Sequence, residues 1–485
     1  MRLVSLTSLR LRLRRPAPRA APLLVAGWCA FLFLYGISAG PLYRTEALRA
    51  IIGRECLRGY WLYPVLYGEP FLTKPPGHYV AIGLCSLPVG DVTAASARLP
   101  SVLAGFVCVG DVYGLFRRVL GERAAVLAAV LLPCSLLWLD KVPSAEIDMT
   151  LVGWVAAAIV LLHRALEAEG RAATRYWVAA LLCVAGGALT KWTAPAFFYL
   201  TAVPLLAWRG QLRLLLGRGH LVAVGVAGAL CGLWATLVIT QVGCDALADT
   251  VRREAAYRFA PKAGKGYPWS EVALYPLAVL AAHLPVSAFA ALTFRKRFWE
   301  SSGARARLLA QLLHCWTWPN LLFWTLVPNH NVRYALPMSA GLMGLGVMGL
   351  LSLISREPKA GAAARKLVSG GAAFLCCWCV AKVVFVEVVI PTRTAGRNAE
   401  ATAAALRERV PAHQPLYVFK LKDEGVTFYY ARPVARGTDP RALPPGAFAL
   451  LIRPEWEDRA AFGRATLVYC MHDQQGDPIY LVRNP

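Results

Sequence analysis

Apolar stretches long enough to cross a lipid bilayer recur along most of this chain and constrain its fold more than any other feature. A spanning helix needs about 20 apolar residues. Eleven candidate runs lie near 22–40, 99–116, 124–140, 149–164, 176–190, 194–208, 220–241, 271–293, 308–328, 334–354 and 368–391. Because 57% of the residues are hydrophobic and only 16% are charged, the apolar excess must face lipid. We expect a polytopic α-helical membrane protein with about eleven transmembrane helices.

The basic residues occur in short clusters between these runs and predict the orientation. The formal net charge of +24 could suggest nucleic-acid binding, but the cations do not form one stripe or domain, which argues against it. With a cytoplasmic N-terminus, every dense cluster between spans falls in an inner loop, as the positive-inside rule requires. These loops are 117–123, 164–175, 209–219, 294–307 (with Arg295 and Lys296) and 355–366 (with Arg356, Lys359, Arg365 and Lys366). The predicted localisation is the inner (plasma) membrane.

This orientation depends on how two apolar stretches are interpreted. Tyr79 to Val89 is too short to span, so we interpret it as an interfacial or re-entrant helix; a full span there would invert every later loop. The basic segment from Arg10 to Arg19 precedes the first run and could begin a signal peptide. Because no convincing cleavage site follows, with 38–40 the nearest, we interpret the first run as an uncleaved span.

Two outer segments and a C-terminal region complete the organisation. Segment 41–75 has apolar residues and arginines at helical spacing, which predicts an amphipathic surface helix with arginines free to meet lipid phosphates; a solvated loop is the alternative. Segment 243–268 is also basic, with Lys262 and Lys265 near its end. We therefore expect a transmembrane domain over 1–391, with an outer first loop at 41–90, and an extracytoplasmic α/β domain over 392–485. Its expected elements are a helix at 398–410 and strands at 416–420, 426–430, 448–453, 465–471 and 478–483.

Cysteines indicate little about function. Most lie in apolar runs, where they behave as small hydrophobic residues. Cys56, Cys244 and Cys470 fall in predicted outer segments, where a disulfide is possible but cannot be assigned.

A small set of ionisable residues remains on the predicted outer side. The candidates are Glu46, Lys74, Glu146, Asp148, Lys191, Arg258, Arg333 and Tyr334. Each has an ordinary alternative: an acid at a helix start stabilises the helix dipole, and a lysine at the membrane surface can snorkel. Together they place cations and carboxylates at one membrane face. Cations can hold a phosphate leaving group and a carboxylate can deprotonate a hydroxyl, whereas no nucleotide-binding motif is present.

The order of motifs resembles the GT-C glycosyltransferases, in the branch of bacterial aminoarabinose–lipid A transferases and protein O-mannosyltransferases. The matching motifs are Thr45-Glu46, the run 59–64, 67–70, Lys74-Pro75-Pro76, 97–101, 146–149, 189–191 and Arg333-Tyr334 with Pro337. The resemblance implies a multi-spanning fold with outer juxtamembrane helices, a polyprenyl-phosphate-linked sugar donor, a lipid or protein acceptor, and transfer with inversion.

The resemblance also implies roles for the candidates. Glu46 and Asp148 would be the catalytic acids, with Glu46 as base or as the carboxylate that positions the acceptor. Lys74, Arg258, Arg333 and Tyr334 would bind the donor phosphate, and Glu146 and Lys191 would support them. The sequence departs from the family where Arg44-Thr45 precede a lone glutamate and where Trp192 replaces the usual glycine. No cofactor is indicated with certainty, although some relatives bind a divalent metal.

Two other functional classes fit a polytopic chain. A transporter or lipid flippase would often show internal repeats and broken helices midway through the membrane, and neither is visible in the sequence. A non-catalytic scaffold or sugar-lipid binding subunit would tolerate loss of Glu46 and Lys74.

Overall fold

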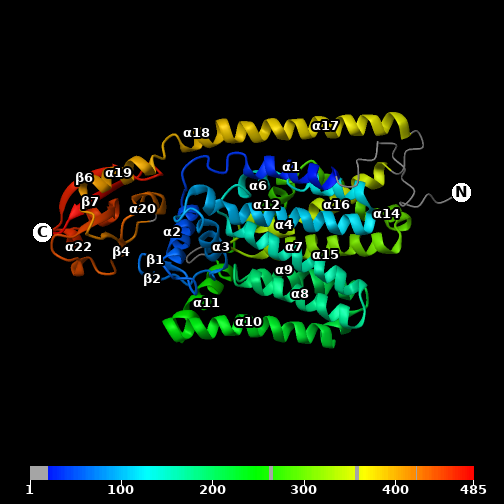
Figure 1. Ribbon diagram of the computed structural model, residues 1–485, viewed down its shortest axis with the longest axis horizontal. Coiled ribbons are helices and arrows are strands. Elements are labelled where there is room, and N and C mark those ends of the chain that lie inside the picture. The colour runs from blue at the N-terminus through cyan, green and yellow to red at the C-terminus, as the bar shows by residue number, and fades with distance from the viewer. Residues whose placement is uncertain (1–19, 262–265, 355–359, 422) are drawn as a thin grey trace. The chain divides into compact units, whose positions relative to one another are not determined.

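The computed structural model describes residues 20–261, 266–354, 360–421 and 423–485 (Figure 1). Several members of the predicted basic clusters fall outside the described residues or side chains: Arg10 to Arg19, Lys262, Lys265, Arg356, Lys359, Arg365 and Lys366. The chain divides into two compact units. Unit 1 comprises 1–35, 73–77 and 101–382, and unit 2 comprises 36–72, 78–100 and 383–485.

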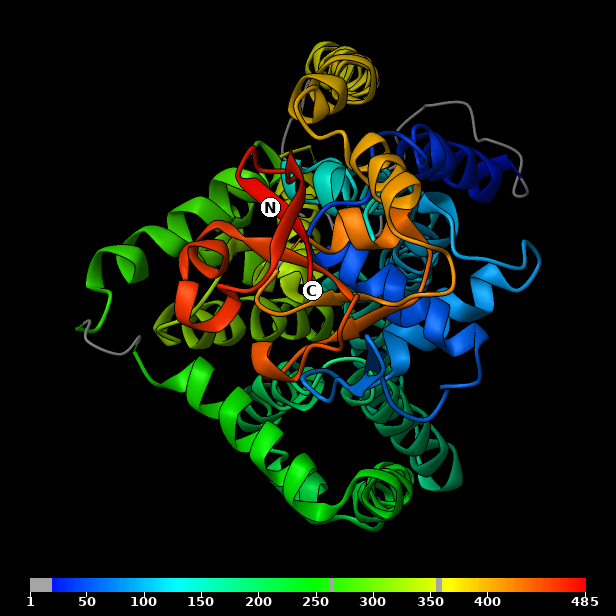
Figure 2. The ribbon, with the colours of Figure 1, turned by 90° about the vertical axis from the view of Figure 1, so that its left-hand side faces the viewer.

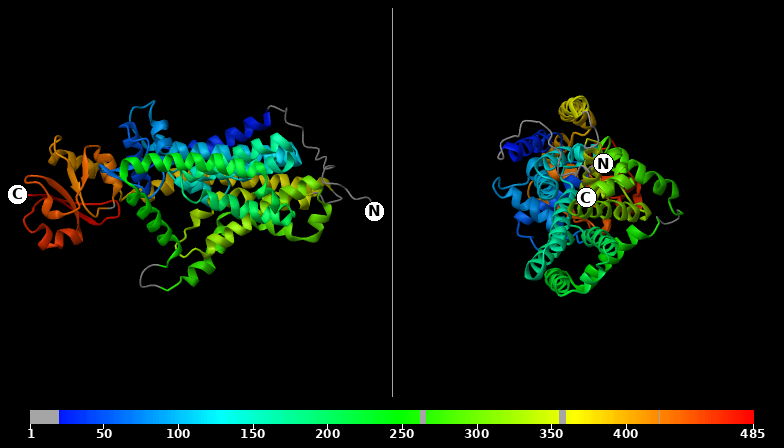
Figure 3. Two further views of the ribbon diagram at one scale, coloured as in Figure 1. Left: turned by 90° about the horizontal axis from the view of Figure 1, so that it is seen from below. Right: turned by 90° about the vertical axis from the view of Figure 1, so that its right-hand side faces the viewer.

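Unit 1 is a bundle of helices. Its elements are α1 (Ala20–Leu34), most of α4 (Ala94–Leu120), α5 (Glu122–Leu131), α6 (Leu136–Lys141), α7 (Ile147–Glu167), α8 (Gly170–Ala188), α9 (Ala194–Trp208), η2 (Leu212–Leu216), α10 (Arg218–Val242), α11 (Cys244–Phe259), α12 (Trp269–Ala282), α13 (Val286–Phe289), η3 (Ala290–Phe294), α14 (Lys296–Ser301), α15 (Ala304–Leu326), η4 (Val332–Met338), α16 (Ser339–Ile354) and α17 (Ala360–Val384). α8 packs against both α7 and α10 (Figure 3).

Several of the helices are long and apolar enough to cross a membrane. Among the described residues, five are long and apolar enough to span: α4, α7, α10, η4 with α16, and Ser369–Thr394. α1 and α9 are shorter apolar helices. In an 18-residue stretch of α10 only 11% of the residues are buried, although the mean hydropathy of that stretch is 2.2. Such an exposed apolar surface requires lipid or a partner around it.

Two of the predicted spans are interrupted. The run 124–140 breaks between α5 and α6, and the run 271–293 forms two helices bent by 102° with Pro285 at the break. Proline ends a helix because it lacks an N–H and restricts its neighbour. The bend fits a broken span or a re-entrant loop, so the number of eleven spans stays a prediction. α3 (Gly77–Ser86) has 10 residues and is too short to span, as its sequence predicted.

Glycines on α16 let α13, in the second half of this bent pair, pack closely against α16. A Cβ at Gly346 would lie 2.3 Å from the Val286 carbonyl oxygen, and one at Gly349 would lie 2.0 Å from that of Phe289. Neither contact could be accommodated by a larger residue without moving backbone. Small residues of this kind allow close helix packing where the surroundings are lipid.

Unit 2 combines helices with a five-stranded sheet of order β4-β3-β5-β7-β6 (Figure 2). Its elements are α2 (Thr45–Leu57), β1 (Val65–Leu66), β2 (Glu69–Pro70), α3, the π-helical turn η5 (Phe385–Val389), α18 (Ile390–Thr394), α19 (Ala399–Arg409), β3 (Leu416–Val418), α20 (Glu424–Tyr430), β4 (Val434–Arg436), η6 (Pro440–Ala442), β5 (Phe448–Ile452), α21 (Arg453–Glu457), α22 (Arg459–Phe462), β6 (Thr466–His472) and β7 (Pro478–Arg483). β3 pairs parallel with β4 and β5, whereas β7 pairs antiparallel with β5 and β6.

Two local predictions for unit 2 were wrong. The run 426–430 is helical rather than a strand, because the Asp423 side chain accepts hydrogen bonds from the Gly425 and Val426 amides and caps α20. A short apolar run alone does not distinguish these structures. α2 is helical as expected, but its arginines are not all free for lipid. Arg49 is buried, and Arg54 forms an ion pair with Asp91 at 2.7 Å.

The cysteines, all thirteen of which lie in the described part of the chain, form no disulfide.

Candidate functional site

The start of α7 places two carboxylates inside unit 1. Glu146 directly precedes the helix and Asp148 lies in its first turn, with exposed fractions of 4% and 1%. The Ser101 hydroxyl accepts a hydrogen bond from the Glu146 amide and donates one to the Glu146 carbonyl, both at 3.0 Å. Ser101 thus fixes the backbone from which both acids project. Asp148 is further favoured by the positive end of the helix dipole.

Two cations neutralise these acids. Lys191, in the loop between α8 and α9, forms a buried ion pair with Asp148. Arg333, in η4, donates a hydrogen bond from Nη1 to Glu146 Oε2 at 3.2 Å, and its Nε lies 3.6 Å from Asp148 Oδ2. Residues nearly 190 positions apart in the sequence therefore share one charged network.

The Lys74-Pro75-Pro76 segment lies against the loop that carries Lys191. The Gly77 amide donates to the Leu189 carbonyl oxygen at 2.8 Å. A Cβ at Gly77 would approach that oxygen to the same distance, so the contact needs glycine. The two prolines fix an extended backbone, and Lys74 forms an ion pair with Glu254 of α11. The diproline turn thereby holds the lysine in a defined place.

Arg258, one turn after Glu254 on α11, is the least satisfied cation of the site. It is 8% exposed, and its Nη1 has no hydrogen-bond partner among the described residues. Its guanidinium carbon lies 5.3 Å from the centre of the Tyr334 ring and 6.0 Å from that of Trp324. The Lys191 ammonium lies 4.5 Å from the same tyrosine ring. Tyr334 is therefore the aromatic centre around which the cations gather.

These residues form what we call the charged cluster: Lys74, Glu146, Asp148, Lys191, Glu254, Arg258, Arg333 and Tyr334. Four cations face three carboxylates, which leaves one net positive charge. Burial lowers the pKa of Lys191 to about 8, although Asp148 opposes that shift. Burial likewise lowers the pKa of Lys74, against the attraction of Glu254. An anion bound here would stabilise both ammonium groups.

Seven of the eight predicted site residues meet in this cluster, and sequence analysis missed some of their neighbours. Glu254 had a usable signal, because it lies four residues before Arg258 and hence on the same helix face. Tyr275 and Trp324 had no signal beyond apolar helical spacing. Both are buried, and the Tyr275 hydroxyl and the Trp324 Nε1 have no partner within the described part of the chain. Tyr275 is close enough to Asp148 and Tyr334 to interact electrostatically with them.

The eighth predicted residue, Glu46, belongs to unit 2. It lies in the first turn of α2 and forms an ion pair with Arg98 at 3.2 Å. Arg98 is buried and also donates to the carbonyl oxygens of Ile37 and Ala39, at 2.9 and 2.8 Å. Arg98 thus anchors the segment before α2 as well as Glu46. The catalytic role of Glu46 stays a prediction.

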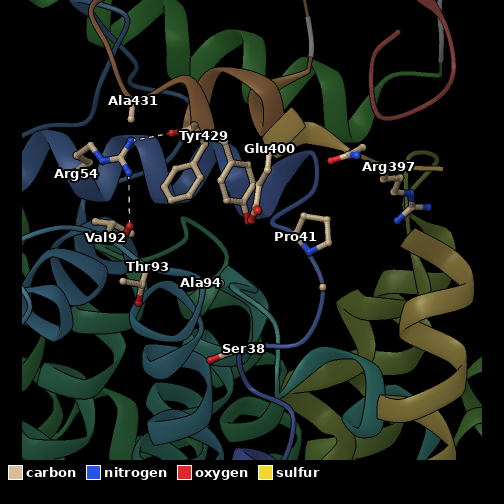
Figure 4. A pocket seen from close by; sticks show the side chains of 13 residues that line it. Ser38, Pro41, Arg54, Val92, Thr93, Ala94, Arg397, Glu400, Tyr429 and Ala431 are labelled. Carbon is tan, nitrogen blue, oxygen red and sulfur yellow. Dashed lines mark hydrogen bonds between the residues drawn. The ribbon is translucent and has the colours of Figure 1, made fainter. Parts of the chain in front are cut away.

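Unit 2 also contains a pocket of about 620 Å³ (Figure 4). Arg54 lies on one wall, donating to the carbonyl oxygens of Phe428 at 3.0 Å and Val92 at 3.5 Å. Tyr429 and Glu400 line it from the C-terminal part of the chain, and the Tyr429 hydroxyl accepts a hydrogen bond from the Leu42 amide. The lining residues of the pocket come from both the first loop and the C-terminal part of the chain.

No group of three or more His, Cys, Asp or Glu side chains among the described residues is arranged to hold a metal ion. A divalent metal therefore stays an untested expectation.

Comparisons with known proteins address the family and the fold. A family model described as dolichyl-phosphate-mannose-protein mannosyltransferase matches residues 73–239. The crystal structure of ArnT from Cupriavidus metallidurans bound to undecaprenyl phosphate is similar over 97% of this chain and 99% of that chain, with a TM-score of 0.72 and 17% identity. The predicted resemblance is confirmed.

Two further structures have related folds. The apo state of the same ArnT has a TM-score of 0.69 and 16% identity, over 97% of this chain and 99% of that chain. An Archaeoglobus fulgidus oligosaccharyltransferase in complex with Zn and sulfate has a TM-score of 0.51 and 13% identity, over 95% of this chain and 72% of that chain. No curated protein matches the chain in sequence. At these identities the likeness concerns the fold.

Proposed function

We propose that this chain is an integral membrane glycosyltransferase that moves a sugar from a polyprenyl-phosphate carrier to a hydroxyl or phosphate acceptor, with inversion at the anomeric carbon. The observation that carries the proposal is the charged cluster. It combines a net positive charge with a buried arginine whose Nη1 lacks a partner among the described residues. Such a preorganised arrangement suits a phosphate better than a neutral ligand.

In this proposal Lys74, Arg258, Arg333 and Tyr334 bind the donor phosphate. The acceptor oxygen attacks the anomeric carbon, the bond from that carbon to the phosphate oxygen breaks, and polyprenyl phosphate leaves with the electron pair. The cations stabilise the charge that develops on the leaving oxygen. The fold similarity to an ArnT bound to undecaprenyl phosphate supports a donor of this class.

The two catalytic acids would have different tasks. Asp148 forms ion pairs with both Lys191 and Arg333, so its carboxylate is engaged by two cations of the cluster. We therefore assign Asp148 to orienting those cations. Glu46 would accept the proton of the acceptor hydroxyl, which is the role implied by its motif.

The location proposed for this chemistry is the extracytoplasmic face of the inner (plasma) membrane. A cytoplasmic N-terminus places the basic loops 117–123, 164–175, 209–219 and 294–307 inside, and the C-terminal α/β region outside. Apolar helices and the fold similarity support a multi-pass arrangement. A reporter scan tests the orientation, with residue 300 expected inside and residue 420 outside.

A release assay tests the transferase. The purified chain in lipid vesicles is supplied with a panel of polyprenyl-phosphate sugars and an envelope extract from cells lacking the gene, and free polyprenyl phosphate is measured by mass spectrometry. We expect release that Asp148→Asn and Glu46→Gln abolish. The matched control is Glu69→Gln, because Glu69 is an exposed acid of the same first loop. Movement of the intact carrier across the bilayer without release would instead identify a flippase.

A further inference from the structure

The pocket of about 620 Å³ in unit 2 shares no residue with the charged cluster. Its walls come from the segment before α2, from α2 itself, from the start of α4, and from the region of α19 and α20 (Figure 4). A volume of this size can hold a small organic group. The proposed transfer of sugar does not use this pocket, so its lining was searched for polar groups without a partner.

Two parts of the wall lie where apolar helices end. Ser38 follows the apolar helix α1 by four residues, and Arg397 follows the candidate span Ser369–Thr394 by three residues. In the predicted orientation both helix ends are on the outer side of the membrane. The pocket therefore belongs to the layer of lipid headgroups that borders the hydrocarbon core.

Arg397 is the cation of this pocket that remains available to a ligand. Its guanidinium carbon lies 3.9 Å from the centre of the Tyr43 ring, and its side chain has no hydrogen bond or ion pair with any described residue. Stacking on a ring leaves the N–H groups in the guanidinium plane free to donate. Arg54, on the other side of the pocket in Figure 4, is instead engaged by Asp91 and by the Phe428 carbonyl oxygen.

Glu400 supplies an available carboxylate to the same pocket. It is the second residue of α19, its side chain is exposed, and it forms no ion pair within the described part of the chain. It lies three positions after Arg397, so the two backbones are at most about 11 Å apart. The Tyr429 hydroxyl is close enough to Glu400 to interact electrostatically. That hydroxyl accepts a hydrogen bond from the Leu42 amide and keeps its own proton for a ligand.

We propose that this pocket binds the headgroup of a zwitterionic phospholipid of the phosphatidylethanolamine type. Its phosphate would accept hydrogen bonds from Arg397 and Tyr429, and its primary ammonium would donate to Glu400. One ligand thereby satisfies two opposite charges that do not pair with each other. The proposal is independent of sugar transfer and concerns a bound membrane lipid.

Other headgroups match these charges less well. An anionic lipid such as phosphatidylglycerol would satisfy Arg397 but would bring a negative charge near Glu400 without an ammonium to offset it. The trimethylammonium of phosphatidylcholine carries no N–H to donate to the carboxylate. A neutral sugar would displace water from both charges without replacing it by an opposite charge, which costs free energy.

Lipid retention by the full-length chain tests the charges. The protein is reconstituted in vesicles of equal parts phosphatidylethanolamine, phosphatidylcholine and phosphatidylglycerol, extracted into detergent and examined by native mass spectrometry. We expect one phosphatidylethanolamine to be retained in preference to the others. Arg397→Met keeps apolar packing on Tyr43 but should lower this retention about tenfold, whereas Arg397→Lys should keep most of it. Glu400→Gln should abolish the preference for phosphatidylethanolamine over phosphatidylcholine.

Two control variants change charges outside the pocket. Glu408→Gln lies on the same helix as Glu400, and Arg453→Met removes another arginine of unit 2. The Glu408 and Arg453 side chains are 75% and 66% exposed. Both variants should retain phosphatidylethanolamine as the wild type does.

A further variant tests the pocket without changing either charge. Ser38→Trp places a large ring at an exposed position of the wall that lies outside any helix, so the unfolding temperature should stay the same while the lipid is lost. Equal retention of phosphatidylethanolamine and phosphatidylcholine by the wild type would overturn the proposal. Unchanged retention in both Arg397→Met and Ser38→Trp would also overturn it. Binding of soluble phosphoethanolamine without retention of the lipid would overturn the assignment to a membrane lipid.

Discussion

The ion pair between Lys74 and Glu254 allows binding and stability to be separated by experiment. The two side chains are 21% and 20% exposed. Breaking a buried pair leaves one charge without compensation and costs several kcal/mol. Because about one fifth of each side chain reaches solvent, screening reduces this to about 1–2 kcal/mol. A phosphate oxygen at Lys74 would add a charge-assisted hydrogen bond worth about 1.5–3 kcal/mol, or roughly 10- to 150-fold in affinity.

Three variants have different expected outcomes. Lys74→Met should lower both thermal stability and affinity for undecaprenyl phosphate. Glu254→Gln should lower stability, but it frees the ammonium and so should keep or strengthen the affinity. The double variant should regain much of the stability and none of the affinity. Both quantities are measured on purified protein, by thermal unfolding and by titration with undecaprenyl phosphate.

The affinity of Glu254→Gln for undecaprenyl phosphate shows whether Glu254 competes with the phosphate for Lys74. If Glu254→Gln weakened undecaprenyl phosphate binding as much as Lys74→Met does, then Glu254 would position the lysine for the phosphate instead of competing with it. Equal affinities in all three variants and the wild type would remove Lys74 from the phosphate site altogether.

Three further predictions concern single residues. Ser101→Ala should lower kcat more than donor affinity, because it removes two hydrogen bonds that fix the Glu146 backbone; equal loss of both would indicate general unfolding. Burial lowers the pKa of Lys191 to about 8, so kcat/KM should fall as pH rises through that value. In Lys191→Arg this fall (the alkaline limb of the pH profile) should move to higher pH, because a guanidinium keeps its proton. An unmoved limb would assign it to another group. Arg54→Met should lower the unfolding temperature, because it removes contacts to Asp91 and Phe428; an unchanged temperature would show that these contacts contribute nothing.

That the site residues lie together could be predicted, because the local composition of each segment indicates on which side of the membrane it lies. Apolar runs and basic clusters assigned Lys74, Asp148 and Arg333 to one face without any knowledge of packing. In the structure Asp148 forms an ion pair with Arg333 and is close enough to Lys74 to interact with it electrostatically. Their actual partners could not be predicted in the same way. Glu254 pairs with a residue 180 positions away, and no periodicity encodes such a distance.

Other predictions were wrong because they too depended on contacts between distant segments. The arginines of α2 looked suited to lipid phosphates, but Arg54 instead contacts Phe428, 374 positions later. The run 426–430 looked like a strand until Asp423 capped it as a helix. Periodicity reports which face of a segment is apolar, whereas caps and long-range polar contacts depend on which segments meet. Bends such as the one of 102° near Pro285 also depend on neighbours, here on the glycines of α16.

The charged cluster also bears on how the proposed reaction would proceed after transfer. A polyprenyl-phosphate sugar is a phosphodiester with one negative charge, whereas free polyprenyl phosphate is a monoester with a charge near −1.5 to −2 at neutral pH. Arg258, Tyr275 and Trp324 each carry an N–H or O–H group that has no hydrogen-bond partner among the described residues. The phosphate of the product would offer these groups more negative charge than the phosphate of the sugar donor does. The same electrostatics that stabilises the leaving group therefore holds the product. We accordingly expect product release rather than bond cleavage to limit turnover, with a burst of one equivalent of transferred sugar before the steady state. A linear time course from the first turnover would refute this expectation, because it would show that transfer or an earlier step limits turnover.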